Sequence, residues 1–386
     1  MLLNGSVARI LIGSVIAGAL TVSAMAADVL PKSTQKMLSD LKIAPTVMNG
    51  IDQELAVPAA WMEGAKQEGT VKILGSWDIG QFNAMVAPFK ERYPTIKLDY
   101  SRGDFNARAM RPLIALKEGR YVTDIITGFG GSTHYYQQAD ALEDLRPLPG
   151  FKNPLPGTGD PEGTWVGSRL RYWCMTYNTN FVKKDELPKT WDDLLTNPRW
   201  RNGNIGVSNR PQLWLLMLWG EYGEKWVTDY IDKFFNVVKP QLRKEGQNAL
   251  QSLVIAGEFH MAMPAADYRT KQYTDKGAPI SWHCPEPVPL AVSQMGILKG
   301  NPHPNASKVW VNWFLSKEGQ IAQYVADQAT PLHKDLQTSD FVAFPEELAR
   351  HKIASRTPDS GNDTEKLNSI WNDYWSKSGG KSTGAQ

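Results

Sequence analysis

The spacing of hydrophobic residues alternates between a strand pattern and a helix pattern from about residue 70 onward. Residues 71–74 form a short apolar run, and apolar side chains then recur at helical spacing over 82–93. Side chains over 96–100 alternate as in a second strand, a helix is expected over 105–117, and residues 124–127 are typical of a short buried strand. The pattern predicts a βαβαβ unit, and such units pack into parallel sheets.

The second half of the chain repeats this alternation without a detectable sequence repeat. Strands are expected over 165–178, 205–207 and 259–263, with helical stretches between and after them. The stretch 150–163 is rich in proline and glycine, which marks a surface connection. We therefore predict an α/β protein with two similar lobes.

Two loops at the carboxyl ends of predicted strands could receive a ligand. The first contains Ser76 and Trp77, and the second, G-F-G-G-S-T over 128–133, opens a helix at Ser132. Backbone N–H groups at a helix N-terminus suit an anionic or polar group, and α/β proteins bind ligands at this edge of the sheet. The alternative is a glycine turn with a Ser/Thr helix cap. The spacing matches neither nucleotide-binding glycine motif, so a nucleotide site is not supported.

The first residues have the features of a secretory signal peptide. A basic residue precedes an apolar stretch over 10–22, and A-M-A over 24–26 is an A-x-A cleavage site. The apolar stretch is too short to span a bilayer. We predict a signal peptide over 1–26 that is cleaved near Ala26, a polar leader over 27–56, and export to the periplasm.

The composition is that of an ordinary globular protein, since 42% of the 386 residues are hydrophobic and 21% are charged. With 42 Lys and Arg against 40 Asp and Glu, the formal charge is +2, so no electrostatic field favours a nucleic-acid partner. We expect neither a nucleic-acid partner nor a cofactor.

The motif H-E-x-x-H does not occur in the chain, and its six His are scattered. No ordered set of Ser, His and acidic residues stands out. We therefore predict a binding protein and not an enzyme. An exported hydrolase is the alternative from another class, and a sensor subunit that binds a solute is a third interpretation.

Several segments, taken in order, resemble bacterial extracellular solute-binding proteins. They are Phe89-Lys90-Glu91-Arg92-Tyr93-Pro94, Tyr177-Asn178, Thr190-Trp191-Asp192-Asp193-Leu194 before Pro198-Arg199-Trp200, Ala256-Gly257-Glu258, and residues 301–306 leading to 315–320. The resemblance runs from about Thr70 to Gln328. The branch it is similar to contains the ferric-iron, polyamine, thiamine and aminophosphonate binders of ABC importers.

The resemblance implies a periplasmic-binding-protein fold of type II, in which a ligand cleft lies between two lobes joined by crossing hinge strands. Crossings are expected near 171–177, 281–287 and Gln328. Lobe 1 would then comprise 57–170 plus 283–327, and lobe 2 would comprise 171–282 plus 328–386. The resemblance also implies a monomer that closes on a small molecule by hinge motion and delivers it to a permease and ATPase complex at the inner membrane.

Ten residues at strand ends, helix entries and crossings are candidates for contact with the ligand: Ser76, Trp77, Ser132, Arg169, Tyr172, Asn209, Arg210, Asp267, Tyr268 and Trp282. Among these residues, Arg169 and Arg210 say most about the class of ligand, because a guanidinium in a cleft favours a carboxylate, phosphonate or phosphate. A salt bridge between strands or at the surface is the alternative for both. Closure of the cleft is expected to bury Trp77 or Trp282.

Cys174 and Cys284 are the only cysteines, too few for a disulfide scaffold and without the C-x-x-C spacing of zinc or redox sites. From the residues alone, the two cysteines could form one disulfide bridge or remain two buried thiols. On the crossings that the resemblance implies, the two residues fall on neighbouring strands. We therefore expect their Cα atoms to be close enough for a disulfide.

The ligand class is suggested by a departure from the family. Iron-binding members carry adjacent Tyr residues at the position of 265–268, where this chain has A-A-D-Y with Tyr268 alone. The departure favours an organic ligand, with Asp267 available for an amine or hydroxyl and Arg169 or Arg210 for an acidic group. We predict an acidic or zwitterionic solute and no metal site, and a ferric-iron or polyamine ligand is the alternative.

Overall fold

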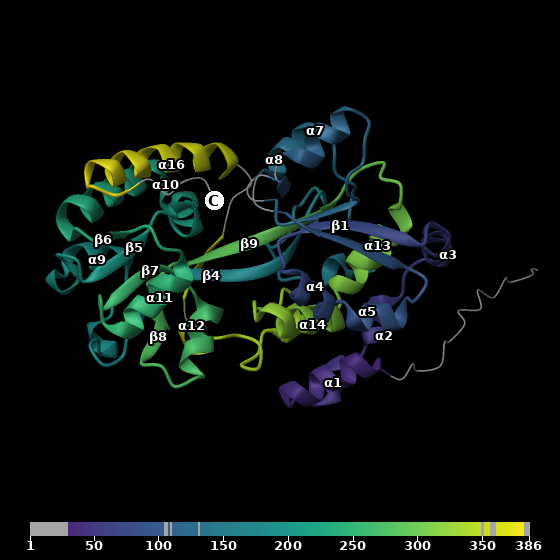
Figure 1. The fold of residues 1–386 in the computed structure, drawn as a ribbon, viewed down its shortest axis with the longest axis horizontal. Helices are drawn as coiled ribbons and strands as arrows, with labels where there is room; N and C mark the ends of the chain where they lie inside the picture. The colour runs from purple at the N-terminus through teal and green to yellow at the C-terminus, as the bar shows by residue number, and fades with distance from the viewer. Residues whose placement is uncertain are drawn as a thin grey trace, which may run out of the picture. The chain divides into compact units, whose positions relative to one another are not determined.

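β4 (Val166–Asn178) is the longest strand among the described residues and runs through both halves of the fold. Its first half, as far as Tyr172, pairs antiparallel with β9 (Val288–Ile297). Its second half pairs with β7 (Met261–Ala266) and β8 (Ile280–His283). Figure 1 shows β4 and β9 side by side between two groups of helices. The described strands therefore join in one sheet, in the order β2-β1-β3-β9-β4-β7-β5-β6.

The computed structural model describes residues 30–103, 107–108, 110–129, 132–348, 351–355 and 360–381, apart from the side chains of residues 248 and 360–362. The predicted signal peptide and the two glycines at 130 and 131 lie outside these residues. From Pro31 on, the chain forms one compact unit. None of the described helices is both long and apolar enough to cross a membrane.

One lobe is built on three parallel strands that continue the sheet from β9. β1 (Thr70–Gly75) lies between β2 (Lys97–Arg102) and β3 (Ile125–Thr127), and β3 runs antiparallel to the end of β9. Alternate residues of β1 are buried, as the period of two in a strand requires. The helices of this lobe are α3 (Ala59–Glu68), α4 (Ile79–Met85), α5 (Ala87–Arg92), α7 (Arg111–Lys117), α8 (Thr133–Gln138), α13 (Pro304–Phe314) and α14 (Lys317–Asp327).

The other lobe continues the sheet on the opposite side of β4. β5 (Ile205–Ser208) pairs in parallel with β6 (Gln241–Arg243) and with β7, and β10 (Ile353–Ser355) pairs in parallel with the start of β9. The helices of this lobe are α9 (Trp191–Thr196), α10 (Leu215–Lys233), α11 (Gln247–Ala256), α12 (Asp267–Thr274), α15 (Pro345–Leu348) and α16 (Ser360–Lys377). The protein has the α/β architecture of two lobes joined by crossing strands that the sequence predicts.

Two sets of contacts bear on where the chain crosses between the lobes. The strand that runs beside β4 into the first lobe starts at Val288, whereas residues 281–283 belong to β8. Beyond Gln328 the chain remains on the first lobe, where the Leu155 N–H donates to Leu332 O at 3.0 Å. The boundaries at 283 and 328 stay predictions, and these contacts favour later positions for both.

The leader packs against the start of α14 through buried polar contacts. In α1 (Lys32–Leu41), Thr34 Oγ1 donates to the fully buried carboxylate of Glu318 at 2.6 Å. The same carboxylate accepts from Arg92 Nε at 2.6 Å and from Trp313 Nε1 at 2.9 Å. Glu54 in α2 (Ile51–Leu55) accepts from the first backbone N–H of α14 at 2.8 Å. The leader is therefore an integral part of the first lobe.

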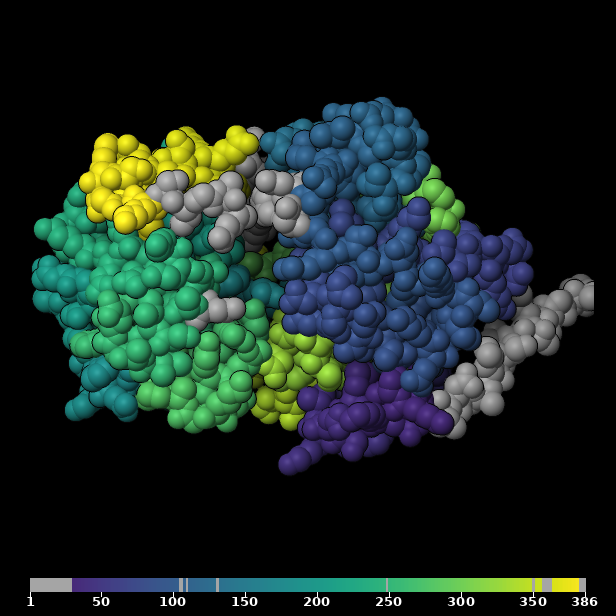
Figure 2. Space-filling view, in the orientation of Figure 1, coloured from purple at the N-terminus to yellow at the C-terminus, as the bar shows by residue number. Residues whose placement is uncertain are grey.

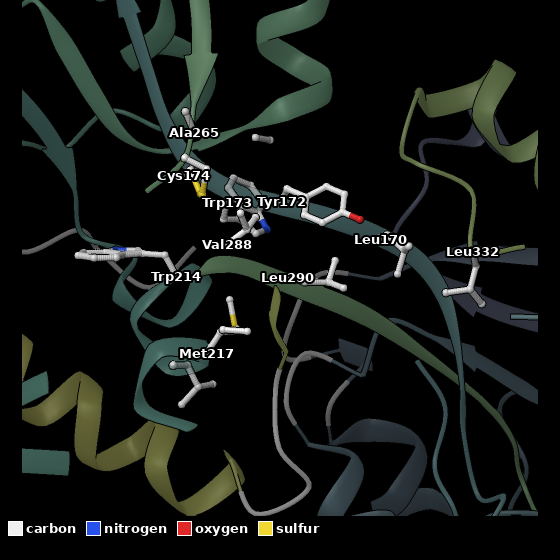
Figure 3. Packing of buried hydrophobic residues seen from close by; sticks show 14 of the residues in the cluster. Leu170, Tyr172, Trp173, Cys174, Trp214, Met217, Ala265, Val288, Leu290 and Leu332 are labelled. Atoms are coloured by element: carbon white, nitrogen blue, oxygen red, sulfur yellow. A yellow bond between two sulfur atoms is a disulfide. The ribbon is translucent and has the colours of Figure 1, made fainter. Parts of the chain in front are cut away.

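One hydrophobic cluster follows the crossing strands from lobe to lobe. Figure 3 shows Leu170 and Tyr172 of β4 beside Leu290 of β9. Trp214, from the second lobe, and Leu332, from the segment after α14, belong to the same cluster. Because the core is continuous along β4 and β9, these two strands connect the lobes by packing as well as by hydrogen bonds.

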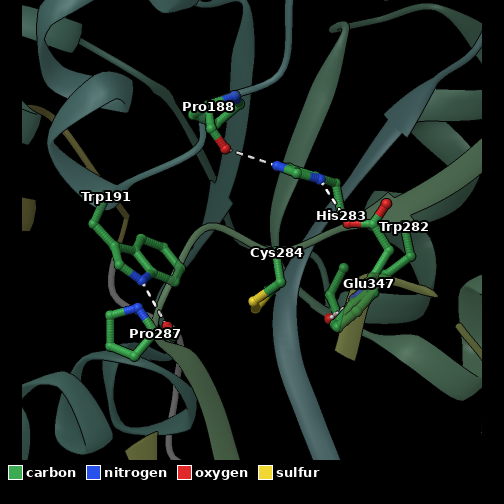
Figure 4. The surroundings of a disulfide bond; sticks show 9 residues. Pro188, Trp191, Trp282, His283, Cys284, Pro287 and Glu347 are labelled. Atoms are coloured by element: carbon green, nitrogen blue, oxygen red, sulfur yellow. Dashed lines mark hydrogen bonds and ion pairs between the residues drawn. A yellow bond between two sulfur atoms is a disulfide. The ribbon is translucent and has the colours of Figure 1, made fainter. Parts of the chain in front are cut away.

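A disulfide joins Cys174 in β4 to Cys284, which directly follows β8 (Figure 4). The sequence predicts that the two Cα atoms are close, and they lie 5.1 Å apart. Next to the bridge, His283 contacts Pro188 O through Nε2 at 2.7 Å and Glu347 Oε2 through Nδ1 at 2.8 Å. The bridge links positions 110 residues apart in the sequence, so it closes a long loop.

Replacing both cysteines (Cys174→Ser with Cys284→Ser) should lower the free energy of unfolding by about 2–4 kcal/mol, because the bridge restricts a long loop in the unfolded chain. Urea denaturation of oxidised and reduced wild-type protein and of the double variant measures the change. A reductant should lower the wild-type midpoint and leave that of the double variant unchanged. Two titratable thiols in denatured, unreduced wild-type protein would contradict the bridge.

Candidate functional site

The carboxyl ends of β1, β2 and β3 meet at one edge of the first lobe. Ser76 and Trp77 follow β1 directly, and Tyr100 of β2 donates its hydroxyl to Trp77 O at 2.7 Å. A Cβ placed on Gly128, just after β3, would lie 3.6 Å from Ser76 Oγ. The two loops that the sequence singles out therefore lie side by side. On the face drawn in Figure 2, the surface is hollowed between the two lobes.

Arg169 of β4 extends toward these loops. Its Nη2 donates to Ser76 Oγ, and its guanidinium carbon lies 4.7 Å from the centre of the Trp77 ring. Its Nη1 donates to Asp327 Oδ2 at 2.8 Å, whereas its buried Nε has no hydrogen-bond partner among the described residues. Arg169 thus forms a salt bridge, which the sequence analysis gave as the alternative to contact with a ligand. The salt bridge uses only some of the five N–H donors of the guanidinium group.

Arg171 lies two residues further along the strand and so on the same face. Its Nη1 donates to Tyr268 Oη at 3.0 Å, and its guanidinium carbon lies 4.8 Å from the centre of the Tyr268 ring. Its Nη2 lies 3.5 Å from Asp327 Oδ2. The Arg171 side chain is 20% exposed, against 7% for Arg169. Arg171 is therefore the arginine that is more open to a ligand.

The carboxylate of Asp327, the last residue of α14, is shared by the two arginines. Its side chain is 3% exposed, and its Oδ1 accepts from Gln323 Nε2 at 2.9 Å and from the Ala329 N–H at 3.0 Å. Burial alone would raise the pKa of Asp327, but the charges of Arg169 and Arg171 and the hydrogen bonds from Arg169 and Gln323 outweigh burial and hold the pKa below its ordinary value. The three groups together carry one net positive charge at neutral pH.

Asp267 and Tyr172 lie behind this cluster, inside the protein. Asp267, the first residue of α12, is 1% exposed, and its Oδ2 has no hydrogen-bond partner among the described residues. Burial raises the pKa of Asp267 to about 7, although the backbone N–H groups of Tyr268 and Tyr172 and the charge of Arg171 act in the opposite direction. Burial also raises the pKa of Tyr172. The Asp267 carboxyl is closed off from solvent in this structure.

Trp77 and Trp282 are already buried, with 0% and 1% exposure. The Trp77 ring packs against Phe314 with ring centres 5.8 Å apart, and the Trp282 ring stacks on Phe344 at 5.7 Å. Both rings belong to the core in this structure, and the burial of one of them on closure stays a prediction. Trp77 instead supports Arg169 through a cation–π contact.

Three other candidate residues lie outside the cluster of arginines. Ser132 Oγ donates to Phe129 O at 2.6 Å. Asn209 Nδ2 donates to Asn372 Oδ1, on α16, at 3.2 Å, and Arg210 follows it in the same loop. Contact of these three residues with a ligand stays a prediction.

Sequence reasoning misses Arg171 and Asp327. The spacing of two between Arg169 and Arg171 on a predicted strand is the signal that could have identified Arg171. Asp327 carries no comparable signal, because it ends a helix 158 residues away from Arg169 in the sequence.

Glu54, His333 and Asp335 form a group whose ligand atoms are close enough to hold a metal, away from the arginine cluster. However, Glu54 Oε1 lies 3.3 Å from Lys317 Nζ and 3.4 Å from His333 Nε2. The Lys317 ammonium group already supplies the positive charge that a metal would bring. These side chains therefore anchor α2 to the first lobe, and their arrangement does not favour a metal.

Comparison with known proteins identifies the family. The family model of bacterial extracellular solute-binding proteins matches residues 76–321. Iron-bound HitA from Pseudomonas aeruginosa is 20% identical, with a TM-score of 0.63 over 79% of this chain and 99% of that chain. FutA (IdiA) from Trichodesmium, in complex with iron and citrate, is 17% identical, with a TM-score of 0.65 over 81% of this chain and 100% of that chain.

A third structure has the same fold. AfuA from Actinobacillus pleuropneumoniae, with fructose-6-phosphate bound, is 19% identical, with a TM-score of 0.60 over 79% of this chain and 98% of that chain. At these identities, the likeness shows the fold alone. The comparison with curated proteins found no match. The match to the family model over most of both lobes shows that the chain belongs to the bacterial extracellular solute-binding proteins, which bind solutes for ABC importers and are not enzymes.

Proposed function

We propose that this protein is the periplasmic substrate-binding component of an ABC importer and that it captures a small acidic organic solute between its lobes. It acts as a monomer, closes by hinge motion and delivers the solute to a permease and ATPase complex. Family membership supports solute binding and import. The ligand class is our inference from the arginine cluster.

The observation that carries this inference is that two arginines share one carboxylate. Arg169 and Arg171 both pair with Asp327 Oδ2, so one positive charge is left unbalanced where β4 passes between the lobes. Charges interact more strongly at a site that is poorly exposed to water than at an open surface, so this charge attracts an anion. Ser76 and Tyr268 flank the pair from opposite lobes, and an acidic group bound there would contact both lobes.

The state of Asp267 favours an acidic solute over a zwitterion. An amine would need an ionised and accessible carboxylate, whereas Asp267 is buried and has a pKa of about 7. An acidic solute needs no such partner. Two of the similar structures contain an organic anion, citrate with FutA and fructose-6-phosphate with AfuA, and this agrees with the proposal.

Ferric iron is the second candidate, because HitA and FutA are both described with iron bound. In this chain, Tyr268 Oη accepts a hydrogen bond from Arg171 at 3.0 Å. A phenol ionises at neutral pH only when a metal drives it, and the neighbouring guanidinium repels a cation at the same oxygen. The geometry at Tyr268 therefore favours the acidic solute.

Arg171→Met should weaken binding of an acidic solute about 10- to 100-fold, because it removes charged hydrogen bonds to the ligand. A thermal-shift screen of citrate, fructose 6-phosphate, phosphonates, polyamines and ferric salts finds the ligand, since binding to the folded state raises the melting temperature. Titration calorimetry then measures the loss. Arg146→Met, at an exposed arginine paired with Asp144, is the control and should bind normally. Stabilisation by a polyamine and by none of the anions would contradict the proposal.

Ferric citrate added to the purified protein should produce no intense visible absorption of the tyrosinate-to-iron type, because Tyr268 stands alone beside Arg171. Absorption spectra of wild-type protein, Tyr268→Phe and Tyr135→Phe test this, with the exposed Tyr135 as the control. A band that disappears only in Tyr268→Phe would establish the iron alternative.

Asp267→Asn should flatten the pH dependence of stability between about pH 4 and pH 7. The raised pKa means that the folded protein binds this proton more tightly than the unfolded chain, so wild-type stability falls as the pH rises from about 4 to the folded pKa of about 7. The full difference between the pKa of Asp267 in the unfolded chain and in the folded protein corresponds to about 4 kcal/mol of unfolding free energy. Urea denaturation at several pH values measures it.

The control for this change is Asp275→Asn, at an exposed aspartate just after α12. It should leave the pH dependence as in the wild type. An equal slope in wild-type protein and Asp267→Asn would show that Asp267 does not bind a proton over this range.

A further inference from the structure

We propose that Asp327 is a positioning residue that sets the charge selectivity of the binding site, an inference that rests on the proposed function. It holds the two arginines in place and cancels one of their two charges. The site is thereby matched to ligands of low negative charge, and loss of the Asp327 charge would shift its preference toward ligands that carry one more negative charge.

Asp327 acts through the arginines and not by touching the ligand. Its Oδ2 forms ion pairs with Arg169 Nη1 at 2.8 Å and with Arg171 Nη2 at 3.5 Å. Its Oδ1 accepts from Gln323 and from the Ala329 N–H. The side chain is 3% exposed, so neither oxygen is left for a solute.

Each arginine is held on three sides. Arg169 has the Asp327 carboxylate, the Trp77 ring and the Ser76 hydroxyl, all on the side of the first lobe. Arg171 has the same carboxylate and, from the second lobe, the ring and the hydroxyl of Tyr268. Two guanidinium groups on one face of a strand repel each other, and the shared carboxylate offsets this repulsion. Their remaining donors are thus oriented before a ligand arrives, which lowers the ordering cost of binding.

The Asp327 carboxylate repels an anionic ligand at this site, and the repulsion grows with the negative charge of the ligand. A carboxylate that touches both arginines repels an anion bound to them, and it repels a dianion about twice as strongly as a monoanion. Loss of the orienting contacts, in contrast, weakens binding of both ligands alike when they have the same shape. The ratio of the two affinities therefore separates the charge effect from a merely structural role.

The experiment compares isosteric ligands that differ by one charge. Fructose 6-phosphate is paired with fructose 6-sulfate, and succinate with succinamate, at pH 8, where a phosphate monoester is nearly a dianion. Calorimetry measures both dissociation constants of a pair for wild-type protein and Asp327→Asn. The preference for the more highly charged member should rise about tenfold in the variant.

Glu318→Gln is the matched control. Glu318 is also a buried carboxylate of α14 and pairs with Arg92, but it lies at the other end of the helix and contacts the leader. This variant should lose stability as Asp327→Asn does, because both leave a largely buried arginine without its charged partner. Its preference between the paired ligands should stay within twofold of the wild type.

A second comparison covers the case in which Asp327→Asn does not fold. Arg169→Met is compared with Arg169→Met combined with Asp327→Asn, so that Arg169 is not left buried without its partner. The same tenfold rise in preference is expected between these two proteins. Equal weakening of both ligands, with no change in preference, would overturn the role of Asp327. If the thermal-shift screen finds a polyamine and none of the anions as the ligand, the proposed function fails and the inference fails with it.

Discussion

The pairing of β4 with β9 in one half and with β7 and β8 in the other is the constraint on which the rest of the structure depends. A single strand that belongs to both lobes fixes how they connect, and the disulfide from Cys174 reinforces its second half. The alternation of side chains along this strand then places Arg169 and Arg171 on one face, where one contacts the first lobe and the other contacts the second.

Placing two cations on one face of a buried strand is costly unless a counter-charge accompanies them. Asp327 supplies that charge from the end of α14, and the rings of Trp77 and Tyr268 supply further contacts that suit a guanidinium. The arginines, the carboxylate and the two rings are therefore mutually dependent. The same arrangement leaves one of the two arginine charges without a paired carboxylate, and this is the charge on which the proposed binding of an anion rests.

α14 links the leader to the arginines of β4. Glu318, near its start, binds Thr34 of the leader, and Asp327, at its end, binds the arginines of β4. The matched region ends at residue 321, so neither the leader nor Asp327 is described by the family match. The two ends of this helix are thus fixed by ion pairs whose carboxylates are buried.

The sequence by itself determined the α/β pattern, the two lobes and the family, because these follow from local periodicity and from ordered segments of a few residues. Through the resemblance to the family, it also placed Ser76, Arg169 and Tyr268 in one cleft between the lobes. Only the tertiary structure decided that Arg169 pairs with Asp327, that Arg171 is the more open arginine, and that Trp77, Trp282 and Asp267 are buried. Those facts depend on contacts between segments far apart in the chain, which pack according to the shape of the whole core, and no local pattern of residues encodes such contacts.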